Sequence, residues 1–506
     1  MPYLLGIDSG TSSVKTAVVD AGRGALDTAS RECRPVYADG FVEIEMNVYW
    51  EAVKSCIGEL RSRNPEIVRN ISAVSVSSQG VTFATVDSGG NDLGNAVFAY
   101  DERARDDARE ILSRFGAQRI FDITGQPVVS ETFEAPKLLW LRRNELERFR
   151  AINKILLVHD YLIYKLTGRF VSVPSILSSS LLFDVRNRAW WNEMLDFIGL
   201  SSTQLPEIAD AGEPVGNVTP DVSSETGIPH GALVVAGAID QLCGMIGVGN
   251  TRPGILSEST GSFLAVHTVT TDFFVNREAG IHNFCGFQKD GFVLIGICPT
   301  AGSAFEWVKR IFFDSGGENA DTPGWDYFGE IIEKAGAVEP GAEGLLMLPH
   351  LAGKGSPSPN PPVKGMFYGF GLGHRREHFA RAFMESVAYM LRNNLDVFRE
   401  NGLDIGRIHS FGGGARSDVW NGIKADVCGL TIVTPGFSEP GCLGAAILAG
   451  TGCGIYGSIE DGCSELVKKG KMFYPDSDNA EKYEKSYENY LKLNKLIDRF
   501  YMTGDE

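Results

Sequence analysis

The sequence predicts an α/β fold with two domains, and three observations support this prediction. Short apolar runs of strand character alternate with helical patterns along the chain. The length of 506 residues is more than one hydrophobic core usually serves. Each half also begins with a turn of small residues between two apolar runs, at 8–15 and at 256–263. Two such turns, one in each half, predict duplicated domains that face each other across a cleft.

The strand-like runs lie at 18–19, 71–76, 232–236, 263–266, 292–295, 408–411 and 430–433. The clearest helical pattern covers 376–400, where apolar residues recur at spacings of three and four and Gly402 follows as a stop. A turn-rich stretch at 247–254 is the predicted boundary. It divides the chain into an N-terminal domain, 1–250, and a C-terminal domain, 251–506.

Charge and cysteine content narrow the classes of partner. The formal net charge of -17 argues against a nucleic-acid partner, because no basic field attracts phosphate backbones. The nine cysteines are scattered and form no C-x-x-C pair, which is typical of reduced thiols in a cytosolic protein. No secretory leader and no apolar run of membrane-spanning length is evident. We therefore expect a cytoplasmic protein without a membrane partner.

The first of the two turns carries an acidic residue, Asp8, at the exit of its first strand. The flanking apolar runs and the small residues between them are typical of a β-hairpin. Backbone N–H groups in such a turn are uncovered and suit phosphate oxygens, while the carboxylate suits the Mg²⁺ that accompanies them. The alternative is a plain edge hairpin with a solvated Asp8, and the turn alone does not decide between the two.

A second acidic residue, Asp240, follows the strand-like run 232–236 and precedes a glycine-rich segment. An acid at the carboxyl end of a strand in an α/β sheet lies where ligand chemistry usually occurs, and it could act as a general base toward a hydroxyl nucleophile. The alternative is that Asp240 caps the next helix, and position alone favours the cap.

Three further groups are weaker candidates. Gly412–Gly414 follow the run 408–411 and would let a flat ring approach the backbone, or would serve as a loose turn. Gln79 follows the run 71–76, and Tyr100 and Asp101 follow another short apolar run. These side chains could recognise sugar hydroxyls, but a capped turn with surface charges explains each of them equally well.

In this order, the elements resemble the FGGY carbohydrate kinases, members of the actin, Hsp70 and hexokinase ATPase superfamily. The resemblance covers almost the whole chain. Its motifs lie at 8–12, 137–144, 160–168, 237–241, 365–369 with 382–385, 412–417 and 444–446. It implies two ribonuclease-H-like domains that flank a deep catalytic cleft and close over a sugar and ATP with Mg²⁺. It leaves a homodimer open.

The resemblance also implies a role for individual residues. Asp240 matches the catalytic base, and Asp8 matches the carboxylate near Mg²⁺ and the phosphates. The phosphate contacts of the two hairpins correspond to Thr11, Ser12, Thr260 and Gly261. Nucleotide contacts correspond to Gly302, Glu306, Gly413, Gly414, Ala415 and Asp418. The sugar pocket corresponds to Gln79, Tyr100, Asp101, Asp240 and Gln241.

Within that family the chain resembles xylulose kinases most, which implies phosphorylation of a terminal hydroxyl of a pentulose such as xylulose. It departs from them where they usually carry Gly-Gln-Met-His, because this chain has Ser-Gln-Gly-Val at 78–81. Another ketose, a polyol or a sugar acid would fit the altered pocket. A non-catalytic sugar sensor on the same fold is the alternative from another class, although a sensor would be expected to lose Asp8 or Asp240.

Overall fold

Two large mixed β-sheets form the frame of the molecule. The structure is a computed structural model that describes residues 2–38, 40–313 and 327–502. The strands of the first sheet are β1 (Tyr3–Ser9), β2 (Ser13–Asp20), β3 (Gly24–Glu32), β6 (Ile71–Ser78), β14 (Pro214–Asn217) and β15 (Leu233–Ile239). Those of the second sheet are β16 (Ile255–Thr260), β17 (Leu264–Thr270), β18 (Ile281–Cys285), β19 (Phe292–Cys298), β22 (Arg407–Phe411), β23 (Ile432–Pro435) and β24 (Lys469–Phe473).

The two sheets repeat one topology. The first has the order β14-β15-β6-β1-β2-β3, and the second β18-β19-β17-β16-β22-β23-β24. In each sheet the second hairpin strand, β2 or β17, is antiparallel to both of its neighbours. The first hairpin strand, β1 or β16, is then followed along the sheet by two strands that run parallel to it, β6 and β15 or β22 and β23. An antiparallel strand, β14 or β24, closes the row. The duplication expected from the two small-residue turns is therefore confirmed.

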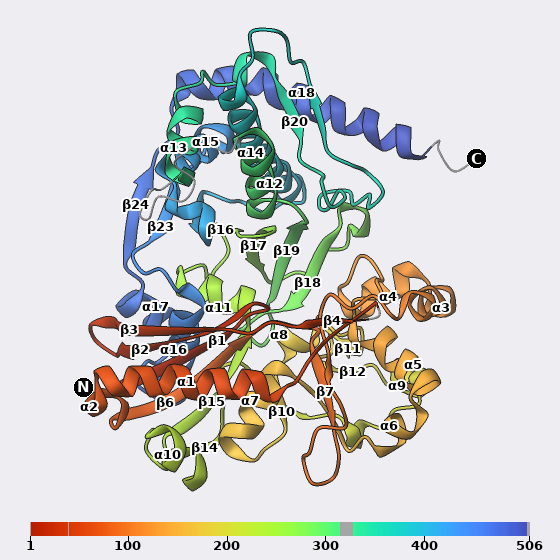
Figure 1. Ribbon diagram of the computed structural model, residues 1–506, viewed down its shortest axis with the longest axis vertical. Coiled ribbons are helices and arrows are strands. Elements are labelled where there is room, and N and C mark those ends of the chain that lie inside the picture. The colour runs from red at the N-terminus through yellow and green to blue at the C-terminus, as the bar shows by residue number, and fades with distance from the viewer. Residues whose placement is uncertain (1, 39, 314–326, 503–506) are drawn as a thin grey trace.

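Each sheet belongs to one lobe of the molecule (Figure 1). The first lobe comprises residues 2–38, 40–247 and 440–466, and the second lobe comprises 255–313, 327–435 and 469–502. The helices of the first lobe are α1 (Asn47–Arg63), α2 (Pro65–Val68), α3 (Arg105–Phe115), α4 (Ala117–Thr124), α5 (Glu134–Asn144), α6 (Leu146–Ala151), α7 (Val158–Thr167), α8 (Pro174–Leu177), α9 (Asn192–Ile198), α10 (Pro220–Thr226), α11 (Asp240–Gly247), α16 (Pro440–Gly452) and α17 (Ile459–Leu466). Those of the second lobe are α12 (Gly302–Phe312), α13 (Tyr327–Gly336), α14 (Arg376–Glu400), α15 (Asp418–Cys428) and α18 (Ser477–Met502).

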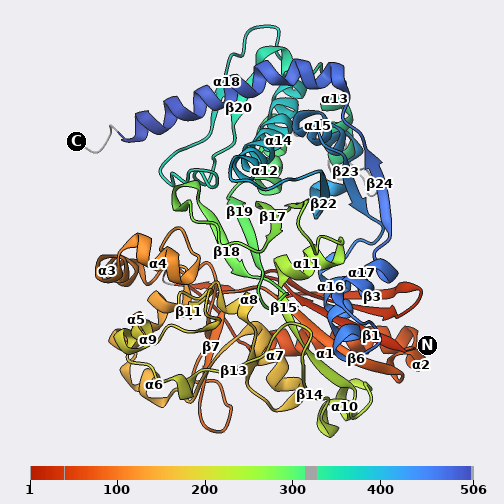
Figure 2. The ribbon, with the colours of Figure 1, turned by 180° about the vertical axis from the view of Figure 1, so that it is seen from behind.

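An additional five-stranded sheet in the first lobe takes two strands from before β6 in sequence and three from between β6 and β15. Its order is β4-β5-β8-β7-β9, with bounds β4 (Val36–Ala38), β5 (Phe41–Ile44), β7 (Phe83–Val86), β8 (Ala96–Val97) and β9 (Lys154–Leu157). With helices α3 to α6 and α9 it forms the side of the first lobe seen at the right of Figure 1 and, from behind, at the left of Figure 2. Three two-stranded sheets complete the described strands: β10 (Val171–Ser172) with β13 (Glu207–Ile208), β11 (Phe183–Asp184) with β12 (Ala189–Trp190), and β20 (Leu346–Leu348) with β21 (Met366–Tyr368).

The local expectations from sequence hold. Every strand-like run falls on a strand, and the periodic segment 376–400 is helix α14 with the same bounds. Its apolar stripe is buried in the core of the second lobe, and Gly402 follows the helix with a φ of +87°. All nine cysteines are free thiols, and eight of them are buried. Among the described helices none is both long and apolar enough to cross a bilayer.

Helix α16 comes from the last quarter of the chain but packs on the first sheet. Glycine makes the close approach possible: a Cβ on Gly6 of β1 would lie 1.9 Å from the Cys442 carbonyl oxygen of α16. A Cβ on Gly444 of α16 would lie 1.9 Å from the Cys243 oxygen of α11. The first core therefore combines the N-terminal half of the sequence with residues 442–466, and the division of the chain after residue 250 stays a prediction.

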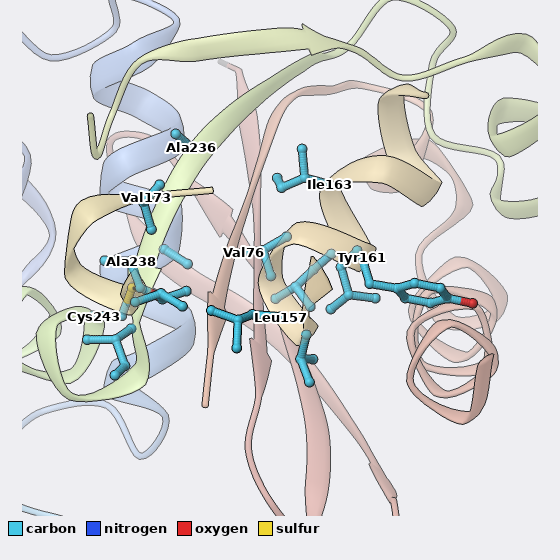
Figure 3. Packing of buried hydrophobic residues seen from close by; sticks show 14 of the residues in the cluster. Val76, Leu157, Tyr161, Ile163, Val173, Ala236, Ala238 and Cys243 are labelled. Carbon is cyan, nitrogen blue, oxygen red and sulfur yellow. The ribbon is translucent and has the colours of Figure 1, made fainter. Parts of the chain in front are cut away.

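The first core holds the strands that lead to Asp8 and Asp240. Figure 3 shows apolar side chains of β6 and β15 packed with those of neighbouring helices; the labelled ones are Val76, Leu157, Tyr161, Ile163, Val173, Ala236, Ala238 and Cys243. All of these are buried. Strands held on both faces in this way give the residues at their ends fixed positions.

Candidate active site

Three strand ends bring two carboxylates to one edge of the first sheet. Asp8 in β1 lies opposite Ser77 in β6, and Ala238 in β15 lies opposite the same serine from the other side. Asp240 follows directly after β15. Because these three neighbouring strands are parallel, their carboxyl ends meet at one edge, which is where α/β sheets bind ligands.

Asp8 is held by contacts from three segments. The Ser77 hydroxyl donates a hydrogen bond to Asp8 Oδ1 at 2.6 Å. Gly441 of α16 lies against the same carboxylate, since a Cβ there would be 2.5 Å from Asp8 Oδ2. Burial raises the pKa of Asp8, and the hydrogen bond from Ser77 and the charge of Lys15 only partly oppose it. Lys15 itself forms an ion pair of 2.6 Å with Glu439, which ties the first hairpin to the start of α16.

Asp240 is the first residue of α11, and Ile239 holds the N-cap position. The capping alternative for Asp240 is therefore wrong; its Oδ1 accepts the N–H of the adjacent Gln241 at 2.7 Å. Burial, and then the charge of Asp8, raise the pKa of Asp240 to about 7. Two neighbouring acids in a partly dry site with displaced pKa values are the usual mark of acid–base chemistry.

A buried histidine fixes the strand that leads to Asp240. The register of β15 shifts between Val235 and Ala238, and at Gly237 in this bulge a Cβ would lie 1.8 Å from the Val76 oxygen of β6. The Gly237 N–H donates to His159 Nε2 at 3.3 Å. The Nδ1–H on the other side of the ring then donates to Asp160 at 3.1 Å. The His159–Asp160 pair therefore holds the backbone N–H of Gly237 in place, three residues before Asp240.

The second hairpin is supported by a buried ion pair. Lys424 Nζ of α15 donates to Glu258 Oε1 at 2.5 Å, and both side chains are fully buried. The Thr260 hydroxyl donates to Glu258 Oε2 at 2.6 Å and receives a hydrogen bond from Lys424 at 3.0 Å. Ser410 of β22 also donates to Glu258. The threonine at the hairpin tip therefore has a single orientation.

Six of the residues expected to contact nucleotide line one cavity of about 590 Å³ in the second lobe: Thr260, Gly261, Gly302, Gly413, Gly414 and Asp418. The three segments touch each other directly. The Gly302 N–H donates to the Gly261 oxygen at 2.7 Å, and a Cβ on Gly414 would lie 2.6 Å from the Thr260 Cβ. The glycines allow the helix start, the hairpin and the 3₁₀ turn Gly413–Arg416 to meet around the cavity.

The other expected nucleotide contacts lie outside this lining. Glu306 is exposed one turn along α12, where it pairs with Lys309 at 3.6 Å, so the structure does not bring it to the cavity. The Ala415 oxygen accepts from the Asn421 side chain at 2.8 Å and stabilises the 3₁₀ turn. Thr11 and Ser12 form the tip of the first hairpin, between β1 and β2.

Two of the expected sugar contacts are occupied by partners within the protein. Gln79 is buried and its Nε2 donates to the Tyr49 hydroxyl at 2.6 Å. Asp101 is fully buried, and each of its carboxylate oxygens accepts a hydrogen bond from the Arg103 guanidinium, at 2.7 and 2.9 Å. Burial opposes ionisation of Asp101, but these bonds and the Val42 N–H outweigh it and hold its pKa below the usual value.

The remaining two expected sugar contacts are more open. Tyr100 is 45% exposed, with its ring edge on Phe98. The Gln241 oxygen lies 2.8 Å from His267 Nε2 of β17, so it links the first lobe to the second. Burial lowers the pKa of His267 to about 4, so the ring is neutral at pH 7 and donates one hydrogen bond through Nε2.

Sequence reasoning did not single out Ser77, Glu258, Lys424 or His159 as site residues. Their partners are distant in sequence, and only the fold brings them together: Lys424 and Glu258 are 166 positions apart. The one available signal was Glu258 itself, an acid inside a strand of otherwise small and apolar residues. A buried acid requires a partner.

Family models match both lobes in sequence order. The model of the N-terminal domain of the FGGY family of carbohydrate kinases matches residues 3–247, and that of the C-terminal domain matches 256–453. The chain belongs to the FGGY family of carbohydrate kinases. As a member of this family it is a sugar kinase, an enzyme that phosphorylates a carbohydrate with ATP as the phosphoryl donor.

Known proteins resemble the chain over its full length. It is 29% identical to the xylulose kinase of Bacillus subtilis over 494 residues, which cover 97% of each protein. It is 27% identical to the gluconokinase of the same organism over 508 residues, 99% of this chain and 97% of that protein. The crystal structure of xylulose kinase from Rhodospirillum rubrum superimposes with a TM-score of 0.89 at 24% identity, over 99% of this chain and all of that one. That structure supports the two-lobed fold.

The Lys424→Met substitution tests the support of the second hairpin. It leaves Glu258 charged and buried without its cation, so we expect a loss of about 3–5 kcal/mol in unfolding free energy and a higher KM for ATP as Thr260 loses its orientation. The matched control is Lys482→Met, which removes an exposed pair with Glu339 and is expected to cost under about 1 kcal/mol. Urea denaturation and ATP kinetics measure both. Equal losses in the two variants would contradict the assigned support.

Proposed function

We propose that the chain transfers the γ-phosphoryl group of ATP to a terminal hydroxyl of a pentulose such as xylulose, with Asp240 as the general base. The observation that carries the catalytic part is the Asp240 carboxylate, which lies at the strand edge beside Asp8 with a pKa raised to about 7. The sugar assignment rests on the full-length similarity to xylulose kinases.

In this proposal Asp240 accepts the proton of the attacking hydroxyl. The sugar oxygen forms a bond to the γ-phosphorus as the bond between that phosphorus and the oxygen of the departing ADP breaks. A base with a pKa near the working pH is ionised often enough to act and basic enough to hold the proton. The bond from the Gln241 N–H keeps one Asp240 oxygen in place and leaves the other for the substrate.

Asp8 is the proposed residue for Mg²⁺. Its carboxylate is a hard oxygen donor and it lies next to a second carboxylate, which fits a cation that takes one or two carboxylates and completes its sphere with water and phosphate oxygens. Mg²⁺ supplies neutralisation of phosphate charge during transfer.

The two hairpins and the cavity are the proposed ATP site. Backbone N–H groups at Thr11, Ser12, Thr260 and Gly261 would stabilise the negative charge on the phosphates. Gly302, Gly413, Gly414, Ala415 and Asp418 would surround the nucleoside. Glu306 is retained as a proposed contact only for a state in which the lobes have closed.

The proposed sugar pocket lies where β6 and β15 end. Asp240 and Gln241 are its candidates for direct contact, with Tyr100 at its rim. Gln79 and Asp101 would act by holding the walls through Tyr49 and Arg103. Val81, which stands where xylulose kinases usually carry histidine, has a φ of +65°, a conformation that strains a β-branched residue. Such strain is typical of functional loops. The cytoplasmic location and the homodimer stay predictions.

The choice of sugar is tested by ATP turnover across a panel of D-xylulose, D-ribulose, glycerol and D-gluconate. We expect kcat/KM for xylulose to exceed the others by at least about tenfold, since a tenfold preference needs only about 1.4 kcal/mol of differential binding. A preference for gluconate or glycerol would replace the sugar assignment while keeping the kinase. ATP hydrolysis that none of these sugars stimulates would favour the alternative of a non-catalytic sugar sensor.

Asp240→Asn tests the general base. The amide keeps the size and the hydrogen-bonding oxygen but cannot accept the proton, so we expect kcat to fall by about 10²–10⁴-fold while the dissociation constant for ATP changes little. Asp221→Asn, which makes the same change at an exposed acid in the first turn of α10, is the matched control and should leave kcat unchanged. Near-normal turnover by the Asp240→Asn variant would remove Asp240 from the mechanism.

The same variant should be more stable than the native chain in the absence of metal. Folding raises the pKa of Asp240 from 3.8 to about 7, so its ionisation destabilises the folded state: the penalty is absent below about pH 4, grows between pH 4 and pH 7 and is complete above pH 7. Because Asn mimics the neutral acid, its gain in unfolding temperature should grow between about pH 4 and pH 7 and stay constant above that. Calorimetry in EDTA measures it. A gain independent of pH would show that Asp240 is not the source.

A further inference from the structure

The two lobes are joined by three chain crossings. The chain passes from α11 to β16, from β23 to α16, and from α17 to β24 (Figure 1). The second and third crossings are hydrogen-bonded to each other, because the Gly436 N–H donates to the Lys468 oxygen at 2.7 Å. The first is bonded to the second sheet, where His409 Nδ1 lies 2.6 Å from the Val248 oxygen. These crossings form the hinge between the lobes.

A cavity of about 380 Å³ lies at this hinge and is lined by residues of the first and third crossings and by the end of β23, where the second crossing begins. Its walls come from the first lobe through α17 and from the second lobe through β22 and β23. A ligand of this size would contact both lobes at the place where they rotate. The cavity shares no lining residue with the nucleotide cavity.

The lining of the hinge cavity is strongly cationic in a protein of net charge -17. Four cationic side chains line it: Arg252, Arg407, Lys468 and Lys469. Among the described residues none of these four forms an ion pair, and Lys468 donates only to the Arg23 backbone oxygen at 3.1 Å. The single lining carboxylate, Glu460, already accepts from Gln288 at 2.9 Å. Unneutralised cations gathered around a cavity attract an anion.

A buried polar atom in the same lining also lacks a partner. His409 is 6% exposed, and with its Nδ1–H donated to the Val248 oxygen its Nε2 has no hydrogen-bond partner among the described residues. Such an atom costs free energy unless a ligand or water satisfies it. Burial, together with the nearby charges of Arg407 and Lys469, lowers the pKa of His409 to about 4. The neutral ring therefore offers an acceptor next to the cations.

We propose that the hinge cavity binds a phosphate group, either free phosphate or the phosphate of a small monoester, and that this ligand controls the closure of the lobes. Phosphate at neutral pH supplies charged oxygens for the arginine guanidinium groups, which bind them in pairs. It also supplies an O–H that suits a neutral imidazole acceptor. Because both lobes contribute to the cavity, the ligand stabilises one hinge angle over others.

The test uses the full chain loaded with Mg²⁺ and a non-hydrolysable ATP analogue, so that the phosphate hairpins are occupied. Inorganic phosphate and ribose 5-phosphate are titrated by calorimetry at constant ionic strength, set with sodium chloride. The Arg252→Gln/Arg407→Gln variant removes two hinge cations. The matched control, Arg61→Gln/Arg114→Gln, removes two exposed cations of the first lobe that line neither cavity.

We expect one equivalent of phosphate or of the ester to bind, at least tenfold more weakly to the hinge variant than to the native chain and equally to the control. Tighter binding of the ester than of phosphate would identify a monoester as the ligand, and the reverse would identify the free anion. Saturating ligand should also change the sugar KM at least twofold in the native chain and not in the hinge variant. Binding that the two variants weaken equally, or no binding at 10 mM, would overturn the site. Binding without any kinetic change would overturn the control of closure.

Discussion

The burial of two carboxylates at one edge of the first sheet is the constraint on which the rest of the site depends. Asp8 and Asp240 come together because β1, β6 and β15 run parallel in fixed register. Helix α16 then covers that edge so closely that only glycine fits beside Asp8, at Gly441. Loss of solvent raises both pKa values, and the charge of Asp8 adds to the effect on Asp240. The packing that makes the fold compact at this edge therefore also sets the chemistry proposed for it.

Duplication of one sheet topology explains why a second hairpin faces the first. The two hairpins occupy equivalent places in the two sheets but are held by different means. Lys15 ties the first to Glu439 through a half-exposed ion pair, whereas Glu258 and Lys424 hold the second through a fully buried one. Burying an ion pair costs desolvation free energy, but the pair holds both side chains in one geometry. The fully buried pair supports the second hairpin, which lines the proposed nucleotide cavity.

The hinge connects these parts. Helices α16 and α17 belong to the first lobe although they lie in sequence between β23 and β24 of the second sheet, so the chain returns to the first lobe and crosses again before its last helix. Those crossings concentrate the movable part of the molecule in a few residues next to the proposed phosphate site. Coupling between that site and the substrate cleft would need no long pathway, because any change of lobe angle alters the distance between the two hairpins.

The sequence by itself determined the α/β class, the two hairpin turns, the bounds of α14 and the places of Asp8 and Asp240 at strand ends, because these depend on local periodicity, turn residues and motif order. It also indicated six residues that line one cavity of the second lobe. Only the tertiary structure decided that Gln79 hydrogen-bonds Tyr49, that Asp101 hydrogen-bonds Arg103, and that Glu306 faces solvent. The partners of Thr260 and Gly237 lie far away in sequence. Such contacts arise from packing between distant segments, which no local pattern encodes.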